Sequence, residues 1–351
     1  STRVRSSAAS DVYKRQGIYR DVDLTITDDV HVDLNGTKVT TPNLETEKGS
    51  TVNTNVTATV ANDSDAAKSV AVRHTVFPKD GSADQSIGTV TTNAQSIAAG
   101  ATAEIQATVP VSNPELWSVE NPSLYTVRTE VLVDGQVTDT YDTEYGFRYF
   151  NFDSNTGFSL NGENMKLKGV CMHHDQGSLG AAAYDSAIDR QVKILKEMGC
   201  NAIRTSHNMP APELVRACDE MGMMLMAESF DEWNVAKCKN GYNLFFDEWA
   251  EKDMVNLLHN FRNNPSVVMW CIGNEVPNQW NEGDTKIAKW LQDICHREDP
   301  TRPVTQGMDA PDAVVNNNFA AVMDVAGFNY RPFKYQENYK KLPQEIILGS
   351  E

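Results

Sequence analysis

Between about residues 20 and 150, apolar and polar residues alternate along the chain in short runs. One run places Val52, Thr54, Val56, Ala58 and Val60 on one side, and another does the same with Val70, Val72, His74 and Val76. A period of two is typical of half-buried strands. Turn-forming dipeptides separate the runs, namely Asn35-Gly36, Lys48-Gly49, Asn62-Asp63, Asp80-Gly81 and Asp134-Gly135. About six or seven such strands within residues 23–150 predict an immunoglobulin-like β-sandwich.

From about residue 160, short apolar runs alternate with segments of helical periodicity. The apolar runs are the expected strands, at 165–171, 202–205, 223–227, 267–272, 303–306, 325–328 and 345–348. Strands that alternate with helices favour a parallel sheet. Seven such units in residues 151–351 predict a (β/α)8 TIM barrel that is truncated after its seventh strand. A doubly wound sheet is the alternative, but no glycine-rich dinucleotide loop follows the first strand.

The net charge of the chain disfavours some classes of binding partner. The 351 residues include 48 acidic and 31 basic side chains, which gives a net charge of −17. Phosphate contacts need clustered Lys and Arg, so we expect no nucleic-acid partner, and an anionic membrane surface is equally disfavoured. An uncharged ligand such as a sugar fits this charge more easily. No apolar run reaches the length of about 18 residues that a membrane span needs.

The six cysteines lie after residue 164 and show no Cys-x-x-Cys spacing. They are expected to be reduced core residues, and a cysteine nucleophile is the less favoured alternative. Residues 1–16 (STRVRSSAASDVYKRQ) are basic and serine-rich, without an apolar signal segment. We expect this stretch to be a non-native, adaptor-derived segment. The compartment is therefore left open between the bacterial cytoplasm, the periplasm and secretion.

Polar residues directly follow the expected strands, where the chemistry of a barrel gathers. In chain order these are His173, His174 and Asp175; Arg204, Ser206, His207 and Asn208; Glu228 and Asp231; Asn274 and Glu275; Gln306 and Asp309; Asn329, Tyr330 and Arg331; and Glu351. Glu275 and Glu351 follow strongly apolar runs. Two carboxylates across a barrel mouth suit glycosidic cleavage, in which one protonates the leaving oxygen and the other attacks the anomeric carbon. The alternative is that either carboxylate only forms a salt bridge with Arg204 or Arg331.

Four motifs then resemble those of one enzyme family. Trp270–Glu275 (WCIGNE) resembles the strand-four motif of clan A glycoside hydrolases. Together with Lys168-Gly169-Val170 before His173, and with Asn201–His207 (NAIRTSH), it is similar to glycoside hydrolase family 2. Gly17–Val22 (GIYRDV) resembles the join between that family's jelly-roll and immunoglobulin-like domains. The resemblance implies that residues 17–22 end a missing jelly roll and that the last barrel unit is also missing.

The resemblance implies a role for each of eight residues. By this resemblance, Glu275 is the general acid/base and Glu351 is the nucleophile. Tyr330 donates a hydrogen bond to the nucleophile and Arg204 supports its charge. Asn274 binds the sugar 2-hydroxyl, His173 and His207 line the substrate pocket, and Asp231 contacts the sugar.

The implied function is retaining hydrolysis of terminal β-D-galactosides by double displacement, with this chain a fragment that is inactive alone. A β-glucuronidase or β-mannosidase of the same family is the nearer alternative. A non-catalytic carbohydrate-binding protein is the alternative from another class. The expected partner is a β-linked oligosaccharide or glycoside, and the full-length protein is a candidate homo-oligomer.

No cofactor is expected. Some family β-galactosidases bind magnesium through a Glu and a His after strand three, but residues 228–234 (ESFDEWN) contain no His. A metal site built on His173 and His174 is disfavoured, because neighbouring strand residues point to opposite sides.

Overall fold

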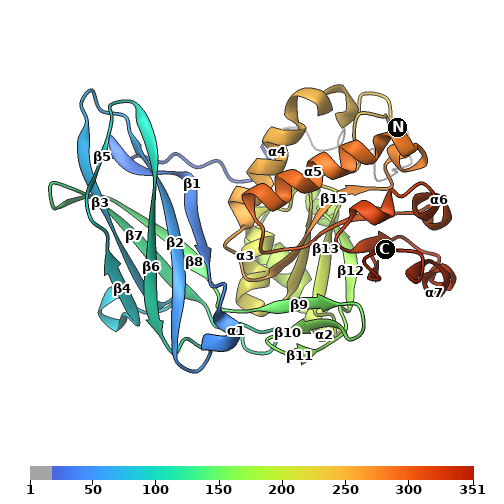
Figure 1. Ribbon diagram of the computed structural model, residues 1–351, viewed down its shortest axis with the longest axis horizontal. Coiled ribbons are helices and arrows are strands. Elements are labelled where there is room, and N and C mark those ends of the chain that lie inside the picture. Colours follow the sequence, from blue (N-terminus) through green and yellow to red (C-terminus); the bar gives the residue numbers. More distant parts are fainter. Residues whose placement is uncertain (1–17) are drawn as a thin grey trace. The chain divides into compact units, whose positions relative to one another are not determined.

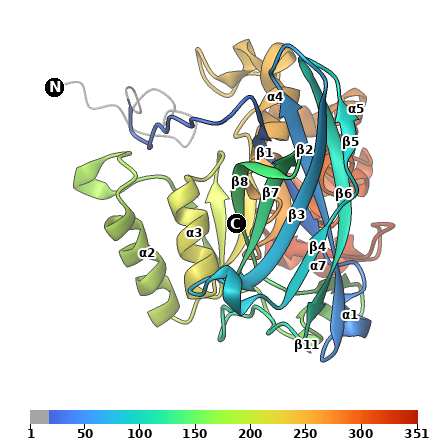
Figure 2. The same ribbon diagram turned by 90° about the vertical axis from the view of Figure 1, so that its left-hand side faces the viewer.

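The chain divides into two compact units in the computed structural model, which describes residues 18–351. One unit contains residues 23–149 together with 262–265, and the other contains residues 18–22, 150–261 and 266–351 (Figures 1 and 2). Residues 1–16, expected to be adaptor-derived, lie outside the described residues.

The first unit is a sandwich of two antiparallel sheets. Its strands are β1 (Val30–Thr40), β2 (Thr51–Asn62), β3 (Lys68–Pro78), β4 (Gly88–Thr91), β5 (Gln95–Ile97), β6 (Ala101–Ser112), β7 (Tyr125–Val133) and β8 (Gln136–Tyr145), with one short helix, α1 (Leu44–Glu47). One sheet has the order β1-β2-β6. The other has the order β4-β3-β7-β8, and β5 pairs with β3.

The alternation of apolar residues is confirmed in the two longest runs. In β2 the side chains at 52, 54, 56, 58 and 60 are buried, and those at 53, 55, 57 and 59 are more exposed. In β3 the polar His74 is also fully buried, with Nδ1 3.0 Å from Oγ1 of Thr129 on β7. The unit has more strands than expected, because β4 and β5 are too short to show a clear period.

The second unit is a curled parallel sheet with helices between its strands. The strands pair in chain order: β12 (Gly169–His173), β13 (Ala202–Ser206), β14 (Met224–Glu228), β15 (Val267–Asn274), β16 (Val304–Met308), β17 (Ala326–Phe328) and β18 (Ile347–Gly349). The helices are α2 (Asp185–Glu197), α3 (Pro212–Met221), α4 (Phe246–Phe261), α5 (Thr285–Glu298), α6 (Pro311–Asn316) and α7 (Tyr335–Tyr339). A small antiparallel sheet of β9 (Phe150–Asp153), β10 (Gly157–Leu160) and β11 (Glu163–Asn164) precedes them.

Two expected strand starts were wrong by two residues or more. The first parallel strand begins at Gly169, where its pairing with β13 starts, rather than at residue 165. A Cβ on Gly169 would lie only 2.1 Å from the carbonyl oxygen of Ala202, so this position needs glycine. Strand β18 covers 347–349 rather than 345–348, because Glu345 has a positive φ of 50°, outside the extended region of a regular strand.

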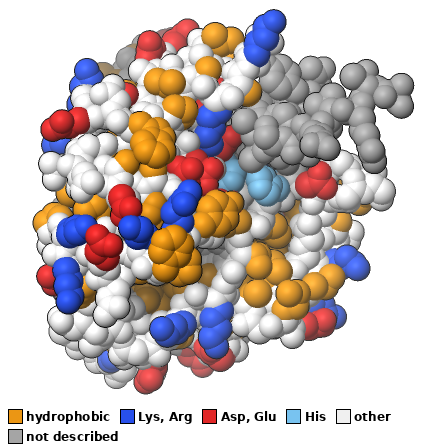
Figure 3. Space-filling view, turned by 90° about the vertical axis from the view of Figure 1, so that its right-hand side faces the viewer, with side chains coloured by type: hydrophobic (Ala, Val, Ile, Leu, Met, Phe, Trp, Pro, Cys, Tyr) orange, Lys and Arg blue, Asp and Glu red, His pale blue; other side chains and the backbone are white. Residues whose placement is uncertain are grey.

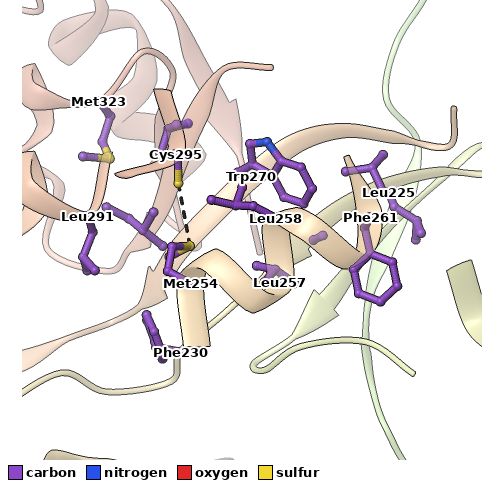
Figure 4. Close-up of a cluster of buried hydrophobic side chains, with 14 of the residues drawn as sticks. Leu225, Phe230, Met254, Leu257, Leu258, Phe261, Trp270, Leu291, Cys295 and Met323 are labelled. Carbon is purple, nitrogen blue, oxygen red and sulfur yellow. Dashed lines mark hydrogen bonds between the residues drawn. The ribbon is translucent and has the colours of Figure 1, made fainter. Parts of the chain in front are cut away.

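The core of this unit lies between the sheet and its helices. Every residue of β15 is buried, as expected for a central parallel strand covered on both faces. Figure 4 shows Met254, Leu257 and Leu258 of α4 packed beside Trp270 and near Leu291 and Cys295 of α5. All six cysteines are free thiols. Among the described residues no helix is long and apolar enough to cross a membrane.

Candidate active site

Glu351 lies directly beyond β18 and is held by groups from two other strand ends. The hydroxyl of Tyr330, which follows β17, donates to Oε1 at 2.5 Å. Nδ2 of Asn329 and Nη1 of Arg204 each donate to Oε2 at 3.2 Å. The hydrogen bond to Glu351, and then burial, raise the pKa of Tyr330 to about 12. Tyr330 therefore remains a hydrogen-bond donor to this carboxylate at neutral pH.

Glu275 follows β15 in a turn with a positive φ of 42°, where its backbone N–H donates to the carbonyl oxygen of Gly307 at 2.7 Å. Its Oε1 accepts a hydrogen bond from Nδ2 of Asn329 at 3.0 Å. The same amide nitrogen therefore bonds both Glu275 and Glu351. The amide is oriented by Ser350, whose hydroxyl donates to Oδ1 of Asn329 at 2.8 Å.

Arg204 lies beneath these two carboxylates and is paired with a third. Its Nε lies 2.7 Å from Oε2 of Glu228, and both side chains are almost completely buried. Nη2 also donates to Oδ1 of Asn274 at 2.9 Å. Burial alone would lower the pKa of Arg204, but the adjoining carboxylate of Glu228 outweighs it and raises the pKa above its usual range. A permanent positive charge therefore lies at the centre of the site.

His207 lies beside Glu228 and Glu351, and His173 lies beside His207. Nδ1 of His207 lies 3.2 Å from Oε1 of Glu228, and its Nε2 lies 3.7 Å from Oε2 of Glu351. The ring of His173 meets that of His207 edge to face, with centroids 5.1 Å apart. His174 instead bonds the carbonyl oxygen of Ala181 through Nε2 at 2.7 Å.

Asp231 and Asn274 contact each other, and both contact Lys237. Nδ2 of Asn274 donates to Oδ1 of Asp231 at 3.1 Å, and Nζ of Lys237 contacts the same oxygen at 2.8 Å. Lys237 also donates to the carbonyl oxygen of Asn274 at 2.8 Å. The structure therefore brings together all eight residues singled out from the sequence, although Asp231 is already engaged by two partners.

A cavity of about 410 Å³ opens beside these residues. It is lined by Tyr19, Arg20, His173, His207, Asn208, Met209, Ser229, Phe230, Asp231, Glu232, Cys238, Gly241, Tyr242, Asp253, Asn256 and Leu257. Glu275 and Glu351 do not line it, but His207, which does, lies 3.7 Å from Oε2 of Glu351. Figure 3 shows histidine and acidic side chains side by side on this face.

The carboxylates after β14 do not fit a metal site. Oε2 and Oε1 of Glu232 accept the backbone N–H groups of Lys237 and Asn243 at 2.6 and 3.0 Å, and Glu228 is paired with Arg204. Within residues 18–351, no group of three or more His, Cys, Asp or Glu side chains is arranged to hold a metal ion.

The cysteines near the site are thiols. Burial raises the pKa of Cys271 to about 12, and burial also raises the pKa of Cys171. A thiolate nucleophile is therefore disfavoured at neutral pH, since the thiolate is the reactive form.

Three residues of the site were not assigned a role from the sequence. Glu228 and Asn329 were recognised only as polar residues at strand ends, and their partners follow from the curvature of the sheet. Lys237 gave no signal at all, because it lies in an irregular loop six residues beyond Asp231.

Two family models match this chain. The family model described as glycosyl hydrolases family 2, TIM barrel domain, matches residues 154–348, and the model described as glycosyl hydrolases family 2 matches residues 30–148. Beta-galactosidase BoGH2A of Bacteroides ovatus is 38% identical over 349 aligned residues, covering 91% of this chain and 40% of that protein. A beta-glucuronidase of Bacteroides fragilis is 30% identical over 198 residues, covering 56% of this chain and 28% of that protein.

A solved structure shows the same fold. The glycosyl hydrolase family 2 member from Bacteroides cellulosilyticus superimposes with a TM-score of 0.89 at 36% identity, covering 95% of this chain and 42% of that one. The chain thus spans less than half the length of these relatives. Because the TIM barrel family model alone matches more than half of the sequence, the chain belongs to glycosyl hydrolase family 2.

Proposed function

We propose that this chain carries the catalytic centre of a retaining glycoside hydrolase that cleaves terminal β-D-galactosides. The observation that supports the proposal most directly is the amide of Asn329, which donates to both Glu275 and Glu351. Since Oε1 of Glu275 and Oε2 of Glu351 lie 3.0 and 3.2 Å from one nitrogen, these oxygens are at most 6.2 Å apart. Retaining enzymes hold their carboxyl groups roughly 5 to 5.5 Å apart, whereas inverting enzymes need about 6.5 Å or more.

The two carboxylates take different roles because their partners differ. Glu351 accepts hydrogen bonds from Tyr330, Asn329 and Arg204, which hold its carboxylate in place as the nucleophile. It attacks the anomeric carbon while Glu275 protonates the leaving oxygen. Glu275 then takes a proton from the water that hydrolyses the glycosyl-enzyme. Asn274 and His207 lie where they can bind sugar hydroxyls beside Glu351.

The charge of the cavity favours an uncharged sugar. Its lining contains the three acidic side chains Asp231, Glu232 and Asp253, against one guanidinium, Arg20, and the Lys237 ammonium that pairs with Asp231. A glucuronide would bring a further carboxylate into this lining. BoGH2A is named a beta-galactosidase, which agrees with this reading. A β-glucuronidase remains the second candidate, because the Bacteroides fragilis relative carries that name. We propose no metal for the reaction.

The finer features of the fold belong to the same proposal. We expect the sandwich to be immunoglobulin-like and the curled sheet to follow the strand order of a (β/α)8 barrel. The proposed partner is a β-linked oligosaccharide or simpler glycoside, as in the substrates named for the relatives.

The test compares aryl β-galactoside, β-glucuronide and β-mannoside as substrates for this chain alone and for the reading frame that contains it. Glu351→Gln is expected to abolish turnover of the preferred glycoside. Glu275→Gln should lower it by about 10²- to 10⁴-fold, and azide, which needs no general base, should restore product as a glycosyl azide. The exposed Glu345→Gln is the matched control and should retain full activity.

Each other outcome changes the proposal in a defined way. Turnover of the glucuronide or mannoside keeps the mechanism and replaces the substrate. Full activity of Glu351→Gln contradicts the assigned nucleophile. A folded protein that binds glycosides but turns over none supports the carbohydrate-binding alternative.

A further inference from the structure

The loop between β14 and α4 contains Lys237, which contacts the backbone of Asn274, the residue before Glu275. The ammonium group of Lys237 lies 2.8 Å from Oδ1 of Asp231 and 2.8 Å from the backbone oxygen of Asn274. The side chains of Lys237 and Asp231 are only 17% and 14% exposed. At this burial an ion pair is screened less by water than a surface pair.

Asp231 in turn contacts the side chain of Asn274. Oδ1 of Asn274 accepts from Arg204 and from Asn329, both at 2.9 Å, while Nδ2 donates to Asp231 at 3.1 Å. Asp231 is therefore the acceptor that holds the Nδ2 end of this amide. Lys237 holds Asp231 there and balances its charge.

The backbone of Lys237 is itself fixed by a buried carboxylate. Oε2 of Glu232 accepts its N–H at 2.6 Å, and Oε1 accepts the N–H of Asn243 at the far end of the loop at 3.0 Å. Glu232 is 4% exposed. The loop is therefore closed on itself around one side chain, so that its lysine reaches the strand end from a defined direction.

We propose that Lys237 is a positioning residue for the hydrolase reaction, which acts through Asp231 and the backbone of Asn274 to place the acid/base Glu275. The proposal rests on the proposed function. Glu275 is the next residue along the chain from the carbonyl that Lys237 bonds, and its own N–H is held by Gly307. The peptide unit before Glu275 is thus held by Lys237, and Glu275 itself by β16.

The kinetic test uses two substrates that differ in how much they need an acid. A dinitrophenyl glycoside has a good leaving group that departs without protonation, whereas a phenyl glycoside needs the proton from Glu275. Lys237→Met should lower kcat/KM for the phenyl glycoside by about 10- to 100-fold and leave the dinitrophenyl glycoside within about threefold. Lys237→Arg should recover most of the loss. Lys239→Met, an exposed lysine of the same loop, should behave as wild type.

Either of two results in this comparison of substrates would overturn the proposal. An equal loss with both substrates would indicate a merely structural role, and no loss with either would indicate none. The double variant Asp231→Asn/Lys237→Met should lose no more than Lys237→Met alone, because both residues act through one contact. Additive losses would contradict that.

A crystal structure of the Lys237→Met variant tests the proposal without a measurement of turnover. The expected change is loss of the hydrogen bond between Nδ2 of Asn274 and Asp231, with a displaced Glu275. An unchanged Asn274 and Glu275 would overturn the proposal. A wild-type protein that turns over no glycoside would count against the proposed function, and this structure would still decide the role of Lys237.

Discussion

At the scale of single residues, the site depends on Arg204, whose guanidinium contacts Glu228, Asn274 and Glu351. The sequence alone predicted that Arg204 supports the charge of Glu351. It could not show that the shorter contact is with Glu228, because a strand-end list gives no distances. The places of Glu275 and Glu351 at strand ends were predictable, since each follows a strongly apolar run.

Arg204→Met should destabilise the protein by about 3–5 kcal/mol, because it leaves the fully buried Glu228 without its counter-charge. The free energy of unfolding in urea measures this loss. Lys289→Met, which removes an exposed pair with Asp293 on α5, is the control and should cost less than about 1 kcal/mol. Equal losses in the two variants would contradict the importance of the buried pair.

His74 predicts a pH dependence of the sandwich. Burial lowers its pKa to about 4, so the folded protein keeps it neutral where the unfolded chain, with a pKa near 6.5, is protonated. Stability from this group is complete above pH 6.5 and is lost as the pH falls toward 4. The wild type should lose about 2 kcal/mol from His74 between pH 7 and pH 5. Urea unfolding of His74→Leu should show that much less pH dependence, and an unchanged dependence would exclude His74 as its source.

At the scale of elements, β16 supports the site through a residue without a side chain. A Cβ on Gly307 would lie 2.4 Å from Nη2 of Arg204 and 2.8 Å from Oδ1 of Asn329. The carbonyl of the same residue accepts the N–H of Glu275. The order and type of these strands followed from the sequence. The need for glycine in β16 did not, because it depends on a guanidinium that arrives from β13.

Gly307→Ala should therefore displace Arg204 and lower kcat/KM by about 10- to 100-fold on the preferred glycoside. Gly283→Ala provides the control, since its added Cβ would meet nothing closer than 3.5 Å and should leave kcat/KM unchanged. Wild-type kinetics in Gly307→Ala would show that the guanidinium can move without cost.

At the scale of the whole molecule, the two units are interleaved along the chain. Residues 262–265 lie between α4 and β15 in sequence but belong to the sandwich unit. There, Oδ1 of Asn263 accepts the N–H of Val39 at 2.9 Å, and its Nδ2 donates to the carbonyl of Thr37 at 3.0 Å. Periodicity along the sequence divides the chain near residue 150 and gives no sign of this return, because four residues are too few to show a pattern.

Asn263→Ala should destabilise the sandwich by about 1–3 kcal/mol, since the N–H of Val39 loses its acceptor. Hydrogen exchange of the amides of β1 should rise in the variant. Asn260→Ala, on the exposed face of α4, is the control and should leave exchange in β1 unchanged. Protection of β1 in Asn263→Ala equal to that of the wild type would contradict the contact.

The interleaving of the two units also limits how domains can be exchanged between related proteins. A sandwich unit encoded by one uninterrupted stretch could be exchanged by a single recombination of that stretch. Here the exchanged stretch would leave behind Arg262 and Asn263, which bond residues 35–39 of β1 and its bulge. Recombination between relatives is therefore expected to succeed only when the donor's residues 262–265 travel with its sandwich, so that these two stretches of one unit are inherited together.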